Sequence, residues 1–289
     1  MSEHSLASVR TRWIDLPTRG GRIATYEVGP ADRPVELVFS HANGFNARTY
    51  LSILAPLERQ LRVLLIDMRG HGRTELPVST ADRSSWNDLR DDLLAVLAAE
   101  NLRDVRLAGH SMGATVSLLA AAQAPEAVRD LVLFEPVIMA PGAGGEPGDS
   151  AIVQGALKRR ADFPSREAAL QSYAGRGPFK GWSPAMLADY VQDGFRDITT
   201  GGVTLSARPE WEFDNYVHQA HDALGALAAS RCPIQIYKAD AGSTCRLDAT
   251  DLGRLAPGRG AMETVPDVSH FLPMERPDLV AAVLSRRLG

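Results

Sequence analysis

Apolar residues along the chain follow two patterns that alternate from residue 35 onward. Runs such as "VLLI" and "LVLF" contain no polar position, which is typical of parallel strands covered on both faces. Segments such as "WNDLRDDLLAVLAAE" and "PDLVAAVLSRRL" repeat their apolar residues at helical spacing. The alternation predicts a mostly parallel α/β sheet with helices on both faces. Near the start, the Gly20–Gly21 pair of "PTRGGR" is a hairpin signal and predicts an antiparallel edge.

One stretch, residues 141–223, departs from this alternation. It opens with "PGAGGEPGDS" and continues through helical segments without an obvious buried strand. Because the chain returns directly to a core strand at Pro233, an all-helical insertion is favoured over a separate domain on a linker. We call residues 141–223 the insertion, and we expect residues 1–140 and 224–289 to form the core.

Composition limits the classes of partner. The 289 residues are 45% hydrophobic and 23% charged, and the net charge of -4 comes without a dense Lys/Arg run. Nucleic acid and anionic membranes are therefore not expected as main partners, and a small-molecule substrate fits better. No secretory signal or membrane span is apparent, so a soluble cytoplasmic protein is expected; oligomeric state is not predicted. Cys232 and Cys245 are expected to be free thiols, with a disulfide as the alternative.

The segment "GHSMG", residues 109–113, matches G-x-S-x-G after a predicted strand and before a predicted helix. A turn this sharp strains its central residue and leaves room only for glycine on either side. Ser111 would then project at a helix N-terminus, where N–H groups favour developing negative charge. The alternative is a helix N-cap serine flanked by glycines.

Four motifs in order resemble the α/β-hydrolase superfamily over essentially the whole chain: "VELVFSHANGFNARTY", "LLIDMRGHGRTE", "GHSMG" and "VPDVSHFLPMERP". The resemblance implies an α/β-hydrolase fold, a serine nucleophile and a lid formed by the insertion. It also implies His270 as general base and acid, because His270 follows the last predicted strand, although Ser269 replaces a common glycine of that loop. His41, His71 and His110 are expected to be loop or packing histidines. By the same resemblance, His41 is expected to brace the loop of residues 41–45, which we call the oxyanion loop.

The same resemblance implies an oxyanion hole made by the backbone N–H groups of Asn43 and Met112. The Asn43 side chain is a candidate for lining the pocket, and Phe45 is a candidate wall residue or an ordinary buried aromatic.

The third member of the triad is ambiguous. Most of the superfamily carries the acid in a G-x-x-D pattern, but here that place falls on Gly242, and Asp240 lies two positions earlier. Some members, haloalkane dehalogenases among them, carry the acid after the strand that follows the nucleophile helix, which here ends at Glu135. Glu135 is favoured over Asp240, because position outranks residue type in a triad. A carboxylate that merely ends a strand is the alternative for Glu135.

The expected reaction is hydrolysis of an ester, thioester or lactone of a small apolar substrate through an acyl-enzyme. No metal, nucleotide or flavin site is indicated, so no cofactor is expected. Alternatives are a carbon–carbon bond hydrolase that binds a substrate carboxylate through Arg176 or Arg196, a cofactor-free perhydrolase, and a non-catalytic ligand receptor. Candidate aromatic residues for an apolar lid surface are Phe179, Trp182, Tyr190 and Trp211.

Overall fold

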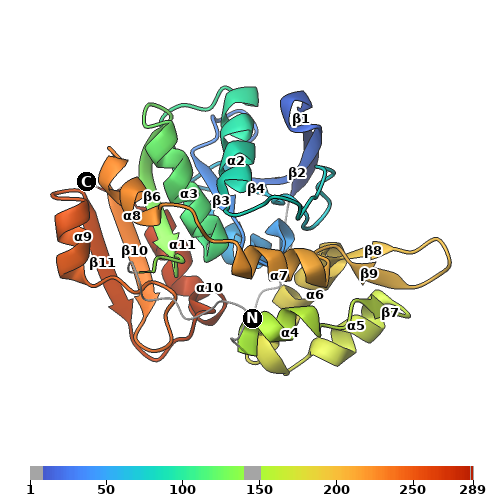
Figure 1. The fold of residues 1–289 in the computed structure, drawn as a ribbon. Helices are drawn as coiled ribbons and strands as arrows, with labels where there is room; N and C mark the ends of the chain where they lie inside the picture. Colours follow the sequence, from blue (N-terminus) through green and yellow to red (C-terminus); the bar gives the residue numbers. More distant parts are fainter. Residues whose placement is uncertain (1–8, 140–150, 287, 289) are drawn as a thin grey trace.

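The computed structural model describes residues 9–139, 151–286 and 288, and Figure 1 shows its central sheet with helices in front and behind. Eight strands lie in the order β1-β2-β4-β3-β5-β6-β10-β11. Their bounds are β1 Arg10–Leu16, β2 Gly21–Val28, β4 Val63–Ile66, β3 Leu37–Ser40, β5 Val105–His110, β6 Val128–Phe134, β10 Ile234–Ala239 and β11 Gly260–Val265. The pairs β1–β2 and β2–β4 are antiparallel, and the other neighbouring pairs are parallel. The predicted mostly parallel sheet and antiparallel edge are confirmed.

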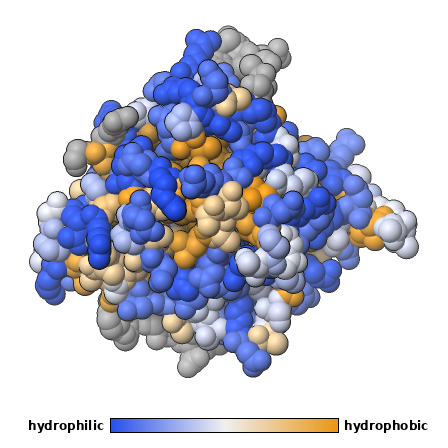
Figure 2. All heavy atoms as spheres, turned by 90° about the horizontal axis from the view of Figure 1, so that it is seen from above, coloured by the Kyte–Doolittle hydropathy of each residue, from blue (hydrophilic) through white to orange (hydrophobic). Residues whose placement is uncertain are grey.

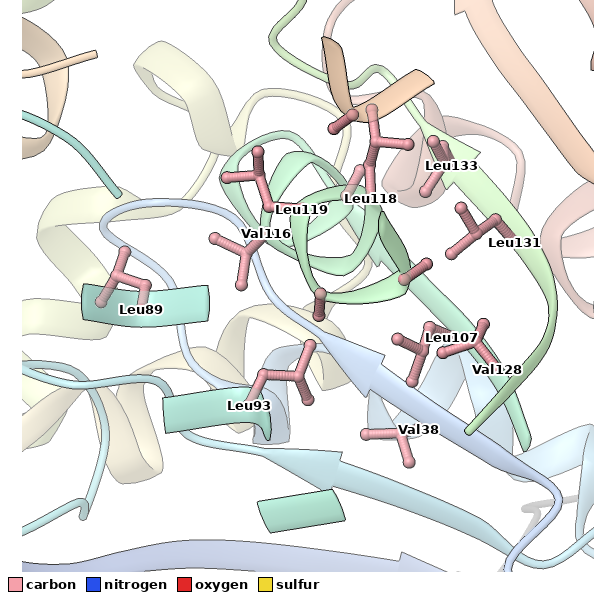
Figure 3. Close-up of a cluster of buried hydrophobic side chains, with 14 of the residues drawn as sticks. Val38, Leu89, Leu93, Leu107, Val116, Leu118, Leu119, Val128, Leu131 and Leu133 are labelled. Carbon is pink, nitrogen blue, oxygen red and sulfur yellow. The ribbon is translucent and has the colours of Figure 1, made fainter. Parts of the chain in front are cut away.

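Both faces of the sheet are covered by helices, as the unbroken apolar runs predict. Residues of β6 alternate between two buried clusters: Leu131 and Leu133 pack in one, and Val132 and Phe134 in the other. The first cluster, part of which is drawn in Figure 3, contains residues of α3 (Met112–Gln123) and of the neighbouring helices. Those neighbours are α2 Asn87–Ala99, α8 Ala223–Ala229 and α9 Ala249–Leu255. The second cluster includes α1 (Leu51–Leu54) and α11 (Pro277–Leu284).

The insertion is not all-helical. It contains the helices α4 Ala151–Leu157, α5 Arg166–Tyr173, α6 Pro184–Gly194 and α7 Pro209–Val217. It also contains a three-stranded antiparallel sheet formed by β7 Asp162–Phe163, β9 Val203–Leu205 and β8 Phe195–Asp197. These strands are two or three residues long and partly exposed, so they leave no apolar run for a sequence pattern to detect. The Gly/Pro-rich opening of the insertion lies largely outside the described residues.

The last helix of the insertion, α7, is built into the core. In Figure 1 it crosses the view between the sheet above and α4 and α5 below. Trp211 is 2% exposed within the core cluster of α2 and α3, and its Nε1 donates to the carbonyl oxygen of Arg69 at 3.0 Å. Trp86 of the core in turn donates to the carbonyl oxygen of Asn215 at 2.9 Å. The predicted lid aromatic Trp211 is therefore a core residue.

The surface offers few large apolar side chains. Within the described residues those classed as exposed are Val78, Met139 and Leu157, and the face drawn in Figure 2 is mostly hydrophilic around a central apolar area. None of the helices described is both long and apolar enough to span a membrane. Cys232 and Cys245 are buried free thiols.

Candidate active site

Ser111 lies on the sharp turn between β5 and α3, in a backbone conformation that L residues seldom adopt (φ 54°, ψ -119°). The two flanking glycines are required by space. A Cβ atom at Gly109 would lie 2.5 Å from the carbonyl carbon of Gly113, and one at Gly113 would lie 2.2 Å from the carbonyl oxygen of Ser40. The predicted G-x-S-x-G turn therefore has the geometry that presents the serine at the edge of the sheet.

His270 brings the serine and a carboxylate together. Its Nε2 lies 3.0 Å from Ser111 Oγ, and its Nδ1 lies 3.0 Å from Glu135 Oε2. The Glu135 carboxylate accepts from Nδ1–H, which leaves Nε2 to accept from the serine hydroxyl. The loop that carries His270 is held by Ser269, whose N–H and hydroxyl both donate to Glu275 at 2.6 Å.

Glu135 is fully buried immediately after β6, with a positive φ of 51°. Its Oε1 accepts hydrogen bonds from the Ala239 N–H at 2.6 Å and from Ser243 Oγ at 2.7 Å, and its Oε2 accepts from the Thr244 N–H at 3.2 Å. Burial alone would raise the pKa of this carboxyl, but the bonds from His270, Ala239 and Ser243 outweigh it and hold the pKa below its ordinary value. The carboxylate is therefore held in its charged form.

Asp240, the competing candidate, lies elsewhere. It is exposed at the end of β10, and its carboxylate accepts a hydrogen bond from the Asp267 N–H at 3.4 Å. The structure thus brings Glu135 to the far nitrogen of His270 and leaves Asp240 outside the hydrogen-bonded group. The strands β6 and β10 are adjacent and parallel, so either strand end was within reach, as the sequence indicated.

The candidate oxyanion groups lie after β3 and at the start of α3. Within the described part of the chain, neither the Asn43 N–H nor the Met112 N–H donates to a backbone carbonyl oxygen. Neighbouring histidines hold this loop: His71 Nε2 accepts from the Gly44 N–H at 3.1 Å, and His41 Nε2 accepts from the Met68 N–H at 2.9 Å. Burial lowers the pKa of His71 to about 4 and that of His41 well below its ordinary value, so both rings are neutral acceptors.

A buried chain of hydrogen bonds, which the sequence did not indicate, joins the loop after β3, the turn that carries Ser111 and the loop that carries His270. The Ala42 N–H donates to the Tyr50 hydroxyl at 3.2 Å, and that hydroxyl donates to His110 Nδ1 at 2.7 Å. His110 Nε2 then donates to the carbonyl oxygen of His270 at 2.8 Å. Burial, with the nearby His270 ring, lowers the pKa of His110 to about 3, which keeps its ring neutral. No motif or spacing singled out Tyr50, because its partner lies 60 residues away in sequence.

Aromatic rings gather around Phe45, which is 7% exposed. Its ring centroid lies 5.2 Å from Trp182, 5.8 Å from Tyr190, 6.1 Å from Phe271 and 6.5 Å from His110. Phe45 therefore connects the ring of His110, next to the candidate nucleophile, with Trp182 and Tyr190 of the insertion. Of the other predicted lid aromatics, Phe179 packs behind this group against both of those rings.

The two arginines predicted as substrate contacts are not placed at this site. Arg176 and Arg196 donate to carbonyl oxygens of Ser172 and Thr74, respectively. The arginine that lies beside the aromatic group is Arg159, which the sequence did not indicate.

Arg159 NH1 lies 2.7 Å from Glu212 Oε2, and Arg159 NH2 donates to the Tyr190 hydroxyl. Its charge is therefore already paired within the insertion.

Comparison with known proteins assigns the chain to a family. The family model described as "Alpha/beta hydrolase family" matches residues 37–283. The chain belongs to the alpha/beta hydrolase family. Its fold is close to the crystal structure of E-2-(acetamidomethylene)succinate hydrolase, with a TM-score of 0.80 over 96% of this chain and 98% of that one. The two sequences are 20% identical, so this likeness shows the alpha/beta hydrolase fold and not the activity.

Curated relatives match over shorter segments of the chain. The dihydrolipoyllysine-residue acetyltransferase component of the acetoin cleaving system of Pseudomonas putida is 31% identical over 123 residues, which is 43% of this chain and 29% of that protein. The 3-oxoadipate enol-lactonase 1 of Acinetobacter baylyi is 29% identical over 106 residues, 36% of this chain and 38% of that protein. The chain therefore spans about a third of the length of the curated relatives it matches.

Proposed function

We propose that this protein is a serine hydrolase that cleaves a carboxylic ester, thioester or lactone through an acyl-enzyme. The observation that carries the proposal is the continuous hydrogen-bonded path from Ser111 Oγ through His270 to Glu135, with two contacts of 3.0 Å. A serine hydroxyl is a weak nucleophile near neutral pH and needs such a base, itself oriented by a third group. Ser111 is thus the nucleophile, His270 the general base and acid, and Glu135 the orienting carboxylate.

The reaction proceeds in two halves. Ser111 Oγ attacks the carbonyl carbon while its proton passes to His270 Nε2, and the Asn43 and Met112 N–H groups stabilise the oxyanion. The leaving group takes the proton from His270 as the carbon–oxygen or carbon–sulfur bond breaks. Water then attacks the acyl-enzyme, gives its proton to His270, and the acid product leaves with Ser111 restored. Glu135 stays ionised throughout and stabilises the His270 imidazolium.

The aromatic group around Phe45 supports an apolar acyl or alcohol portion, because aromatic walls bind apolar groups by burial. The similarity to 3-oxoadipate enol-lactonase 1 supports lactones among the substrates to be tested. The carbon–carbon hydrolase alternative loses its expected arginines, since Arg176 and Arg196 contact other parts of the chain. No contact described for this site favours the cofactor-free perhydrolase or the non-catalytic receptor over the ester hydrolase.

Labelling with a fluorophosphonate tests the nucleophile. The wild-type protein is expected to react and Ser111→Ala to be unlabelled, whereas Ser79→Ala, which changes an exposed serine, is the matched control and keeps wild-type labelling. A panel of p-nitrophenyl esters, thioesters and lactones, run with the same three proteins, then defines the leaving-group class. Labelling that persists in Ser111→Ala, or a wild-type protein that neither reacts nor hydrolyses any member of the panel, contradicts the proposal.

A further inference from the structure

We propose that Asn215 of α7 is a positioning residue that holds the oxyanion loop from the insertion side. This inference rests on the proposed function. Asn215 Nδ2 donates to Asn43 Oδ1 at 2.9 Å, and Asn43 Nδ2 donates to the carbonyl oxygen of Glu212 at 2.9 Å. The single side chain of Asn43 is thus bound at both ends by one helix that lies about 170 residues later in the chain.

Both asparagines are shielded from water, which makes their hydrogen bonds strong determinants of position. Asn215 is 0% exposed and Asn43 is 8% exposed. A buried carboxamide that loses its partner is left with an unsatisfied polar group, so this pairing is costly to break. The Asn43 side chain is therefore occupied by the protein, and the expectation that it lines the substrate pocket is replaced by a role in fixing its own backbone.

Asn43, whose side chain α7 holds, also carries the backbone N–H that is proposed to donate to the oxyanion. Gly44, which follows it, has a positive φ of 74°, so the loop turns sharply at this point and its shape is not set by regular secondary structure. Fixing the carboxamide in two places restricts rotation of the adjoining peptide planes. An oxyanion donor must lie about 2.7–3.1 Å from the developing charge. A small rotation of this loop therefore reduces the stabilisation of the transition state more than it reduces the affinity for the substrate.

The helix that supplies these contacts is itself fixed to the core. The carbonyl oxygen of Asn215 accepts from Trp86 Nε1 at 2.9 Å, and Asp214 pairs with Arg83 at 2.5 Å. The contacts that fix α7 to the core thus use the backbone of Asn215 and the side chain of Asp214, and the Asn215 carboxamide hydrogen-bonds to Asn43 instead. Its removal leaves the attachment of the helix in place.

A second contact from the same helix reaches the next residue of the loop. A Cβ atom at Gly44 would lie 2.7 Å from Glu212 Oε1, so the carboxylate packs directly against this glycine. Glu212 is held in turn by Arg159 at 2.7 Å. Asn215 and Glu212 of α7 therefore both act on the shape of the loop, and Asn215 does so by hydrogen bonding to Asn43.

The test uses steady-state kinetics on the best ester found for the wild-type protein. Asn215→Ala is expected to lower kcat about 10- to 100-fold, less than the loss of an oxyanion donor itself, with KM changed less than twofold. Inhibition by a trifluoromethyl ketone, whose serine adduct carries the oxyanion, is expected to weaken by the same factor as kcat/KM falls. Asn87→Ala, at an exposed asparagine on α2, is the matched control and is expected to keep wild-type values.

A double-mutant cycle separates positioning from general damage. Asn43→Ala retains the backbone N–H but loses the same hydrogen bond, so adding Asn215→Ala to it is expected to cause no further loss of kcat. Asn215→Asp, which keeps the shape but faces Asn43 Oδ1 with a second acceptor, is expected to be at least as impaired as Asn215→Ala. Titration of active sites corrects each rate for any unfolded fraction.

The inference is overturned if the Asn43 and Asn215 effects multiply, if KM rises while kcat stays unchanged, or if Asn215→Ala and Asn215→Asp both keep wild-type kcat. Each of these results presupposes an active wild-type protein. Absence of labelling and turnover in the wild-type protein would instead overturn the proposed function, so the two failures are distinguishable.

Discussion

The strands β6 and β10 are parallel neighbours, and each is followed by a carboxylate, but the two acids have opposite surroundings. Glu135 after β6 is 0% exposed and bonded to His270, whereas Asp240 after β10 is exposed and receives one long bond from Asp267. The loop after β10 takes part all the same, because Ser243 and the Thr244 N–H donate to Glu135. The loop after β10 thus supplies hydrogen bonds to the carboxylate at the end of the neighbouring strand.

This difference shows what selects one carboxylate from two at the same edge. A charged carboxylate is tolerated in a buried position when several donors satisfy it, and the segment after β10 is positioned to supply them. The Ile138 N–H donates to the carbonyl oxygen of Thr244 at 3.2 Å, and the Arg246 N–H donates to that of Ile138 at 2.8 Å, so the segments after β6 and β10 run together over the buried acid. Placement and donors, and not residue type, set the two carboxylates apart.

The largest effect is expected for Glu135→Gln. A glutamine amide would face His270 Nδ1 with an N–H, which favours the ring tautomer that cannot accept the serine proton. We expect kcat to fall about 10⁴-fold, the effect that amidation of the acid has on a Ser-His-Asp triad. Ester hydrolysis and fluorophosphonate labelling rates measure it. A loss below tenfold would remove Glu135 from the triad.

A second prediction concerns pH and stability. The pKa of Glu135 is lowered in the folded protein, so its ionised form contributes stability above the ordinary glutamate pKa of about 4.3, and this contribution disappears as pH falls through the lowered value. The difference in unfolding free energy between wild type and Glu135→Gln should shrink as pH falls from about 5 through the lowered pKa of Glu135. Urea unfolding across this range measures it. A difference that grows on acidification would mean that burial, and not hydrogen bonding, dominates the environment of Glu135.

Ser243→Ala tests the support that the β10 loop gives to the acid. This change removes a 2.7 Å hydrogen bond to Glu135 but leaves the Ala239 and Thr244 donors in place. We expect kcat to fall about tenfold, since a hydrogen bond to a charged group is worth about 1.5–3 kcal/mol and part of it is recovered by the remaining donors. Steady-state kinetics, with Ser79→Ala as control, measures the change. Unaltered kcat would show that Ser243 only fills space.

The smallest effect is expected for Asp240→Asn. This side chain is exposed and outside the hydrogen-bonded path, so kcat and KM should stay within twofold of wild type. The measurement uses the ester chosen for Glu135→Gln, which makes the two variants a matched pair. A loss of several orders of magnitude here, with Glu135→Gln little affected, would exchange the roles of the two carboxylates.

Several features were predictable because they are local. The parallel sheet followed from unbroken apolar runs, and the strained turn at Ser111 followed from two glycines at fixed spacing. Short strands of the insertion were missed, because two or three partly exposed residues carry no apolar period. The prediction that Trp211 lies in the lid was wrong for a related reason. The sequence of an amphipathic helix does not show whether an aromatic side chain packs against the core or against the rest of the insertion.

Local patterns in the sequence predict the order of the core strands and helices, the turn that presents Ser111, the position of His270 late in the chain, and two carboxylates within reach of it. Packing between distant segments brings Glu135 rather than Asp240 to His270, Tyr50 to His110, and Asn215 to Asn43. The physical reason is separation along the chain. Apolar periods and turn sterics act over a few residues, whereas the donors that settle these choices come from segments 60 to 172 residues apart, and packing alone brings them together.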